Sequence, residues 1–171
     1  LVYVDVIIVT GNDETEINNV KVFLKSQFLI KYLGDLKYFL GIKVLKTENG
    51  ICLNQRKYCM ELLHEFGILA CKPVKTSLEP NLVIKREYDL EKFDYLVNIT
   101  EYQKLIGKLI YLTVTRPDIS YVVQLLSQYM LKPYKSHVNI AFRLLRYLKN
   151  SPCMGVHLTK SSSFNLVGFV D

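Results

Sequence analysis

A single carboxylate, Asp5, separates two apolar runs at the start of the sequence, residues 1–4 and 6–10. Both runs are rich in Val, Ile and Tyr, which predicts two short strands, and the charge between them predicts a tight turn or an exposed strand end. An acid held on rigid backbone in this way could bind a metal ion, which needs oxygen ligands at fixed positions. A turn residue that bonds only its own backbone explains the same pattern. Asp5 is therefore a candidate metal ligand, and the local role stays open beside it.

Five basic residues lie on two predicted helix faces and could follow phosphate groups. Lys104 and Lys108 are four residues apart, and Arg143, Arg146 and Lys149 recur at intervals of three. Residues at these intervals share one side of a helix. Such stripes can track a nucleic-acid backbone, whereas a solvated helix face gives the same spacing. Both interpretations remain open.

The other polar residues have simpler explanations. The four cysteines and three histidines show no zinc-ligand spacing, which indicates reduced thiols in an intracellular protein. Glu14, Glu16 and Asp118 fall at predicted helix starts, where acids interact favourably with the helix dipole, and Asp35 is expected as a surface charge. His137 is expected to make a structural hydrogen bond at a helix start rather than to act in catalysis.

The composition excludes a disordered tail and a membrane protein. Half of the 171 residues are apolar, which is enough for a hydrophobic core. The net charge of +6 suits an acidic partner such as nucleic acid, although it does not demonstrate one. No signal-peptide pattern opens the sequence, and polar residues interrupt each long apolar run before membrane-spanning length. We expect a soluble, intracellular protein that is a fragment of a longer polyprotein, because both ends fall inside strand-like patterns.

The first third of the chain predicts a helix and a hairpin. Asp13, with Glu16 three residues later, predicts the capped start of a helix that runs to about Phe28. Alternating apolar residues over 36–46, followed by Asn49-Gly50, predict a strand and a type I′ turn.

Helices dominate the expected remainder of the chain, since apolar residues recur there at intervals of three and four. In chain order we expect a helix over about 55–66, a surface linker over 70–99, helices capped by Thr100 and Thr115, a helix over about 136–150, and strands over 155–159 and 165–170.

Several stretches resemble the copia-type (Ty1/copia) retrotransposon Pol polyprotein. They are Tyr3-Val-Asp-Val6, Leu33-Gly-Asp-Leu-Lys-Tyr-Phe-Leu-Gly-Ile42, Tyr102 to Tyr111 with Leu112-Thr-Val-Thr-Arg-Pro-Asp-Ile119, and Arg143-Leu-Leu-Arg-Tyr-Leu148. The resemblance keeps its order over nearly the whole chain, so the sequence is identified as a member of this family.

The resemblance implies an α+β fold and a part in RNA-directed DNA synthesis. It implies a partial palm with a catalytic-type and a primer-grip-like hairpin over 1–69, a linker over 70–99, a helical thumb and connection over 100–152, and the start of an RNase H-like domain over 153–171. The family acts with Mg²⁺ on an RNA/DNA primer–template duplex and dNTP. Asp5 would be a residual polymerase metal ligand, and Asp171 would match the first acid of RNase H.

The sequence departs from the family pattern at a critical position. Val6 stands where the family has the second Asp of its hairpin, and the strand that carries the third catalytic Asp would precede residue 1. Valine offers no oxygen to Mg²⁺, so we predict no polymerase activity from this chain alone. The alternatives are a noncatalytic nucleic-acid-binding remnant and a pseudogene product without a biochemical role.

Overall fold

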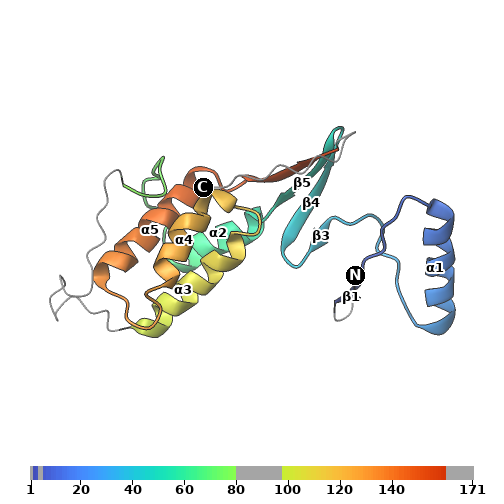
Figure 1. Cartoon of the computed structure of the whole chain (residues 1–171), viewed down its shortest axis with the longest axis horizontal. Helices are drawn as coiled ribbons and strands as arrows, with labels where there is room; N and C mark the ends of the chain where they lie inside the picture. Colours follow the sequence, from blue (N-terminus) through green and yellow to red (C-terminus); the bar gives the residue numbers. More distant parts are fainter. Residues whose placement is uncertain (1, 4–5, 80–97, 161–171) are drawn as a thin grey trace, which may run out of the picture. The chain divides into compact units, whose positions relative to one another are not determined.

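The structure combines helices with antiparallel strands, as the α+β prediction requires (Figure 1). This computed structural model describes residues 2–3, 6–79 and 98–160. The chain forms two compact units, Leu1–Lys37 and Tyr38–Asp171. Within the described ranges, no helix has both the length and the apolar character that crossing a membrane requires.

The first unit contains a strand pair. Strands β1 (Val2–Tyr3) and β2 (Val6–Ile7) run antiparallel, with Tyr3 opposite Val6. The predicted pair of strands is thus confirmed, although both strands are shorter than the apolar runs that predicted them. A two-stranded ribbon of this length has little stability of its own.

The same unit contains helix α1 (Glu14–Gln27), which begins where the sequence predicts. The Asp13 carboxylate accepts hydrogen bonds from the backbone N–H groups of Thr15 (2.8 Å) and Glu16 (3.2 Å), so it satisfies N–H groups that a helix start leaves free. No residue of α1 is buried, and Phe23 in its apolar stripe is 62% exposed. The cap therefore stabilises a helix that has no fully buried face.

The second unit contains a four-stranded antiparallel sheet. Its strands, in spatial order, are β3 (Tyr38–Phe39), β4 (Ile42–Thr47), β5 (Gly50–Asn54) and β6 (Gly155–Thr159).

The prediction of one continuous strand over 36–46 is wrong. Leu40 and Gly41 have φ values of 49° and 74°, and they form a two-residue turn that folds β3 back onto β4 with Phe39 opposite Ile42. Positive φ at both central residues is typical of the hairpin turns that match strand twist. The alternation of apolar residues continues through Leu40 and Gly41, and a leucine with positive φ is uncommon. The sequence pattern therefore gave no sign of a turn between β3 and β4.

Two glycines allow close contact in this sheet. A Cβ atom added to Gly50, where φ is +153°, would lie 2.0 Å from the carbonyl oxygen of Leu158, and one added to Gly155 would lie 2.1 Å from that of Leu53. The turn before β5 uses residues 48 and 49, with Thr47 opposite Gly50. It is therefore one residue earlier than the predicted Asn49-Gly50 turn.

Strand β6 pairs along the whole of β5, from Gly50 opposite Thr159 to Asn54 opposite Gly155. The described part of the predicted 153–171 region thus belongs to the same sheet as the hairpin near residue 45. The predicted strand over 165–170 lies outside the described residues.

Four helices pack side by side in the second unit (Figure 1). They are α2 (Arg56–Glu65), α3 (Ile99–Leu112), α4 (Ser120–Ser127) and α5 (Lys135–Asn150), with a short 3₁₀ helix, η3 (Pro117–Ile119), before α4.

Buried leucines from these helices dominate the core, including Leu63, Leu109, Leu126 and Leu145, each 0% exposed. Each such side chain contributes about 2 kcal/mol when it leaves water. Helix α2 contributes to this core together with α3 and α5. The second compact unit, which begins at Tyr38, therefore includes part of the 1–69 region that the sequence set apart.

Two predicted helix caps are wrong. Helix α3 is capped by Asn98, whose side chain accepts the N–H of Glu101 at 3.1 Å, so Thr100 lies inside the helix. Thr115 caps nothing: its hydroxyl donates to the side-chain carbonyl of Gln55 at 2.7 Å, and both residues are buried. Thr115 therefore joins the α3–α4 connection to Gln55, which lies between β5 and α2.

Candidate functional site

The strand pair at the start of the chain carries the predicted catalytic position. Val6 begins β2, lies opposite Tyr3 and is 36% exposed. Asp5 and Asp171, the two acids predicted to act in catalysis, lie outside the described residues. The described part of the hairpin therefore offers a hydrocarbon side chain at the position where the family resemblance implies a second carboxylate.

The described residues do not fit the magnesium centre that the resemblance implies. Over residues 2–3, 6–79 and 98–160, no group of three or more His, Cys, Asp or Glu side chains could hold a metal ion. Mg²⁺ requires several oxygen ligands around one point. These residues by themselves cannot assemble such a centre, and the role of Asp5 stays a prediction.

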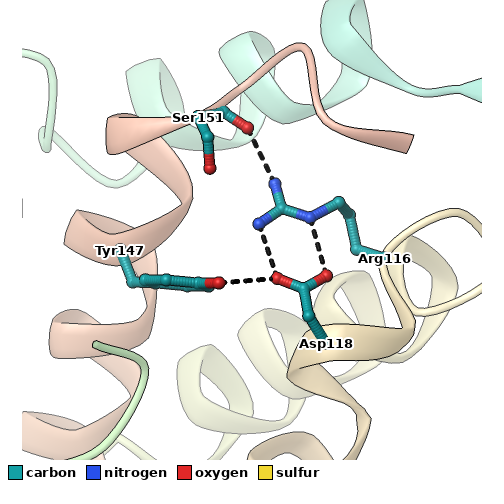
Figure 2. A network of polar contacts seen from close by, with 4 residues as sticks. All are labelled: Arg116, Asp118, Tyr147 and Ser151. Atoms are coloured by element: carbon teal, nitrogen blue, oxygen red, sulfur yellow. Dashed lines mark hydrogen bonds and ion pairs between the residues drawn. The ribbon is translucent and has the colours of Figure 1, made fainter. Parts of the chain in front are cut away.

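The Thr-Arg-Pro-Asp stretch contributes two residues to a polar network in the second unit (Figure 2). The Arg116 guanidinium donates to both carboxylate oxygens of Asp118, with Nε–Oδ1 at 2.9 Å and Nη2–Oδ2 at 2.8 Å, and to the carbonyl oxygen of Ser151 at 2.9 Å. The Tyr147 hydroxyl donates to Asp118 Oδ2 at 2.9 Å. The network therefore joins the start of η3 to α5 and to the residue that follows α5.

Asp118 lies in the first turn of η3, as the sequence predicts, but its main contact is one that the sequence did not reveal. No side chain caps η3, and Asp118 is instead the ion-pair partner of Arg116, whose side chain is 2% exposed. Burial opposes ionisation of Asp118, but hydrogen bonds from Arg116 and Tyr147 outweigh it and hold the pKa of the carboxyl below its ordinary value. The motif is structural here, because each donor and acceptor in it faces another part of the same chain.

Lys104 and Lys108 lie on one face of α3, as the spacing predicts. Both ammonium groups bind Glu65 at the end of α2: Lys104 Nζ lies 2.7 Å from Glu65 Oε1, and Lys108 Nζ contacts Oε2. Hydrogen bonds from the two lysines lower the pKa of Glu65. Sequence spacing could not reveal this acid, because it lies about forty residues earlier in the chain.

Arg143, Arg146 and Lys149 form the predicted stripe along α5, and the stripe contacts residues 69–79. Arg143 donates to Glu79 Oε1 (2.8 Å) and to Thr76 Oγ1 (3.0 Å). Arg146 Nε donates to the carbonyl oxygen of Lys72 at 2.8 Å. Lys149 Nζ donates to the carbonyl oxygens of residues 69 (2.6 Å) and 71 (2.7 Å).

These contacts change the interpretation of the predicted linker. Residues 70–79 are fixed on α5 by the bonds just described and by the Val74 N–H, which donates to the carbonyl oxygen of Arg146 at 3.3 Å. Residues 80–97, the remainder of the linker up to Asn98, lie outside the described residues. Residues 71–79 contain no helix or strand, in agreement with the proline and mixed charge of this stretch, but the sequence carried no information about the helix that this segment contacts.

His137 is a structural residue, as the sequence suggested. It is 0% exposed, its ring stacks on Tyr129 with centroids 3.8 Å apart, and its Nδ1 accepts the backbone N–H of Tyr134 at 3.2 Å. The proton of the neutral ring therefore resides on Nε2, which has no hydrogen-bond partner among the described residues. Burial lowers the pKa of His137.

Known proteins match the whole chain. The family described as "Reverse transcriptase (RNA-dependent DNA polymerase)" matches residues 1–80. The retrovirus-related Pol polyproteins from transposons RE1 and RE2 of Arabidopsis thaliana are 39% and 40% identical over the entire chain, which spans only 11% and 12% of their lengths. An uncharacterized mitochondrial protein of Arabidopsis thaliana is 36% identical, and the chain covers 69% of it. No solved structure matches the chain.

The relatives agree with the family that the residues themselves indicated. Two Pol polyproteins match from the first residue to the last, and the matched region of the reverse-transcriptase family includes the strand pair, α1 and the hairpin that leads into α2. The chain therefore belongs to the copia-type retrotransposon Pol polyprotein family, in which it corresponds to a reverse-transcriptase-like region.

Proposed function

We propose that this chain is a part of a reverse transcriptase that contributes to RNA-directed DNA synthesis without supplying a complete catalytic centre. In this proposal residues 1–69 are a partial palm, 100–152 a thumb and connection, and 153–171 the start of an RNase H-like domain. The main support for this proposal is the residue at position 6. The family match includes this position, and Val6 is paired with Tyr3 in the β1–β2 hairpin. The valine side chain has no atom that could bind a metal ion.

Primer extension tests the catalytic part of the proposal. The purified chain, given a primed RNA template, dNTP and Mg²⁺, should extend no primer. Val6→Asp in this chain alone should remain inactive, because two adjacent acids do not complete the set of oxygen ligands. The same substitution in a fusion with the preceding reverse-transcriptase region of the RE1 Pol polyprotein should give synthesis, while the Val6 fusion should not. Extension by the unmodified chain would contradict the proposal.

A second candidate function is nucleic-acid binding without chemistry. The net charge of +6 and the two sets of helix cations favour it, since contacts to phosphate release counterions and give steep salt dependence. Lys104 is 49% exposed and Lys108 31% exposed at their side chains, so both can reach a ligand if Glu65 releases them.

Binding to a labelled RNA/DNA duplex between about 50 and 200 mM salt tests this second function. Glu65→Gln should bind more tightly and with a steeper salt dependence, because it frees two lysines. The matched control is Glu61→Gln, which removes an acid paired with Lys57 at 3.8 Å on the exposed side of α2 and should change binding less. Absent or salt-independent binding by the unmodified chain would contradict this second function and leave the reverse-transcriptase remnant.

A further inference from the structure

The strap, defined as residues 69–79, runs antiparallel to the end of α5. Successive turns of the helix reach progressively earlier positions in it: Arg143 binds residues 76 and 79, Arg146 binds residue 72, and Lys149 binds residues 69 and 71. Apolar contacts of Cys71 and Leu78 with the helical core support the same placement. The strap is therefore a fixed part of this surface.

The acceptors in these bonds are mostly uncharged. Arg146 and Lys149 donate to backbone carbonyl oxygens, and Glu79, bound to Arg143, is the carboxylate that the strap contributes. Carbonyl groups orient a cation but do not cancel its charge. Most of the positive charge of the α5 stripe thus remains after the strap is in place.

The strap adds two further cations, Lys72 and Lys75. Both are exposed, and neither ammonium group has an ion-pair partner within the described part of the chain. Lys72 is held beside Arg146 by its own carbonyl group, and Lys75 lies between Val74 and Thr76, which are both bonded to α5. The strap and the stripe together carry five cations and one carboxylate.

We propose that Lys72 and Lys75 join Arg143, Arg146 and Lys149 in one surface, the strap patch, which binds the phosphate backbone of a nucleic-acid duplex. This inference rests on the proposed nucleic-acid binding and adds residues that the sequence assigned to a linker. The stripe from Arg143 to Lys149 extends about 9 Å along the helix, which is between two and three times the axial rise of about 3.4 Å from one phosphate to the next on one strand of a duplex. The clustered cations repel one another, and phosphates that neutralise them relieve this repulsion while the cations condensed on the nucleic acid are released.

The test is the double variant Lys72→Gln/Lys75→Gln, with Lys31→Gln/Lys37→Gln as a matched control. The control removes the same charge from exposed positions in the other unit. The strap variant should bind an RNA/DNA duplex at least about tenfold more weakly near 0.1 M salt, and its log–log salt slope should be shallower by about 1 to 2. The control should change both quantities much less. Thermal unfolding should be unchanged in both variants, because the four side chains are exposed.

A third variant tests the patch in the opposite direction. Glu79→Gln removes the carboxylate from Arg143 and should strengthen duplex binding. Equal losses in the strap and control variants, while the unmodified chain binds with a steep salt slope, would overturn the strap patch and leave the proposed nucleic-acid binding intact. Absence of duplex binding by the unmodified chain would overturn both. Preference of the patch for phosphatidylserine vesicles over the duplex would also overturn this inference.

Discussion

At the scale of single residues, Arg116 is buried and its charge therefore needs partners. A buried guanidinium without partners would cost several kcal/mol, and Arg116 is 1% exposed. Asp118 binds it through two parallel hydrogen bonds, the geometry that makes arginine–carboxylate pairs specific, and the Ser151 carbonyl group binds the remaining edge. The short η3 turn brings Asp118 back to Arg116, two residues earlier, and this contact explains the order of residues in the Thr-Arg-Pro-Asp stretch.

Asp118→Asn should destabilise the protein by about 2 to 3 kcal/mol at pH 7, because it leaves the buried Arg116 charge without its partner. The expected cost is no larger than that of breaking a fully buried pair, since the Asp118 side chain is 30% exposed. Since the pKa of Asp118 is held below its ordinary value, this stabilisation is present at neutral pH and is lost as the pH falls through that lowered pKa. Urea unfolding measures the loss. Tyr147→Phe removes one hydrogen bond only and should cost about 1 kcal/mol; equal costs would contradict the role of the ion pair.

His137 should make the protein less stable in mild acid. Its pKa is lowered by burial, so the unfolded chain binds a proton more readily, and the free energy of unfolding should fall as the pH decreases below the ordinary histidine value of about 6.5. Protonation would also turn Nδ1 from an acceptor into a donor facing the Tyr134 N–H. Unfolding of His137→Asn between pH 7.5 and 5 should show less of this dependence. His64→Asn/His157→Asn, at exposed positions, should retain it.

At the scale of elements, polar residues join helices and strands that are distant in the sequence. Glu65 joins α2 to α3, Thr115 joins the α3–α4 connection to Gln55, and the Tyr111 hydroxyl on α3 donates to the carbonyl of Leu40 in the β3–β4 turn. None of these pairs could be predicted from local spacing. The helices could be predicted, since the periodicity of α2, α3 and α5 marked their apolar faces correctly, whereas the β3–β4 turn could not.

Two glycine-to-alanine substitutions should have opposite effects on stability, one in the sheet and one in a helix. Gly50→Ala should disrupt the β5–β6 pairing, because the new Cβ would meet the Leu158 carbonyl oxygen at 2.0 Å in a backbone conformation that favours glycine. Hydrogen exchange of β6 amides should report faster opening. Gly107→Ala is the same chemical change in the middle of α3, where nothing lies within 4 Å, and should stabilise the protein by about 1 kcal/mol. Unchanged exchange in Gly50→Ala would contradict the predicted contact.

At the scale of the whole molecule, burial is concentrated in the second unit. The buried residues of the described chain, from Asn54 to Leu148, all belong to Tyr38–Asp171, while α1 has none. A unit that buries so little apolar surface contributes little to cooperative unfolding.

Removal of residues 1–37 should therefore leave the cooperative unfolding of the helical core nearly unchanged. The melting temperature, measured by calorimetry and by near-ultraviolet circular dichroism, should shift by less than about 4 °C, which is close to 1 kcal/mol for a unit of this size. A larger decrease would show that the first unit stabilises the second. Full-length chain carrying Phe23→Ser serves as a control for the exposed stripe of α1 and should also melt normally.

The sequence by itself determined the family, the α+β class, the capped start of α1 and the apolar faces of the core helices, because motif order and periodicity are local properties. It also predicted that Val6 departs from the family hairpin. Only the tertiary structure decided which charges meet. Glu65 is paired with two lysines of α3, Asp118 with Arg116, and the strap with the stripe of α5. The reason is physical: a charge interacts with whatever lies within a few ångströms, and the fold brings together residues that the sequence separates.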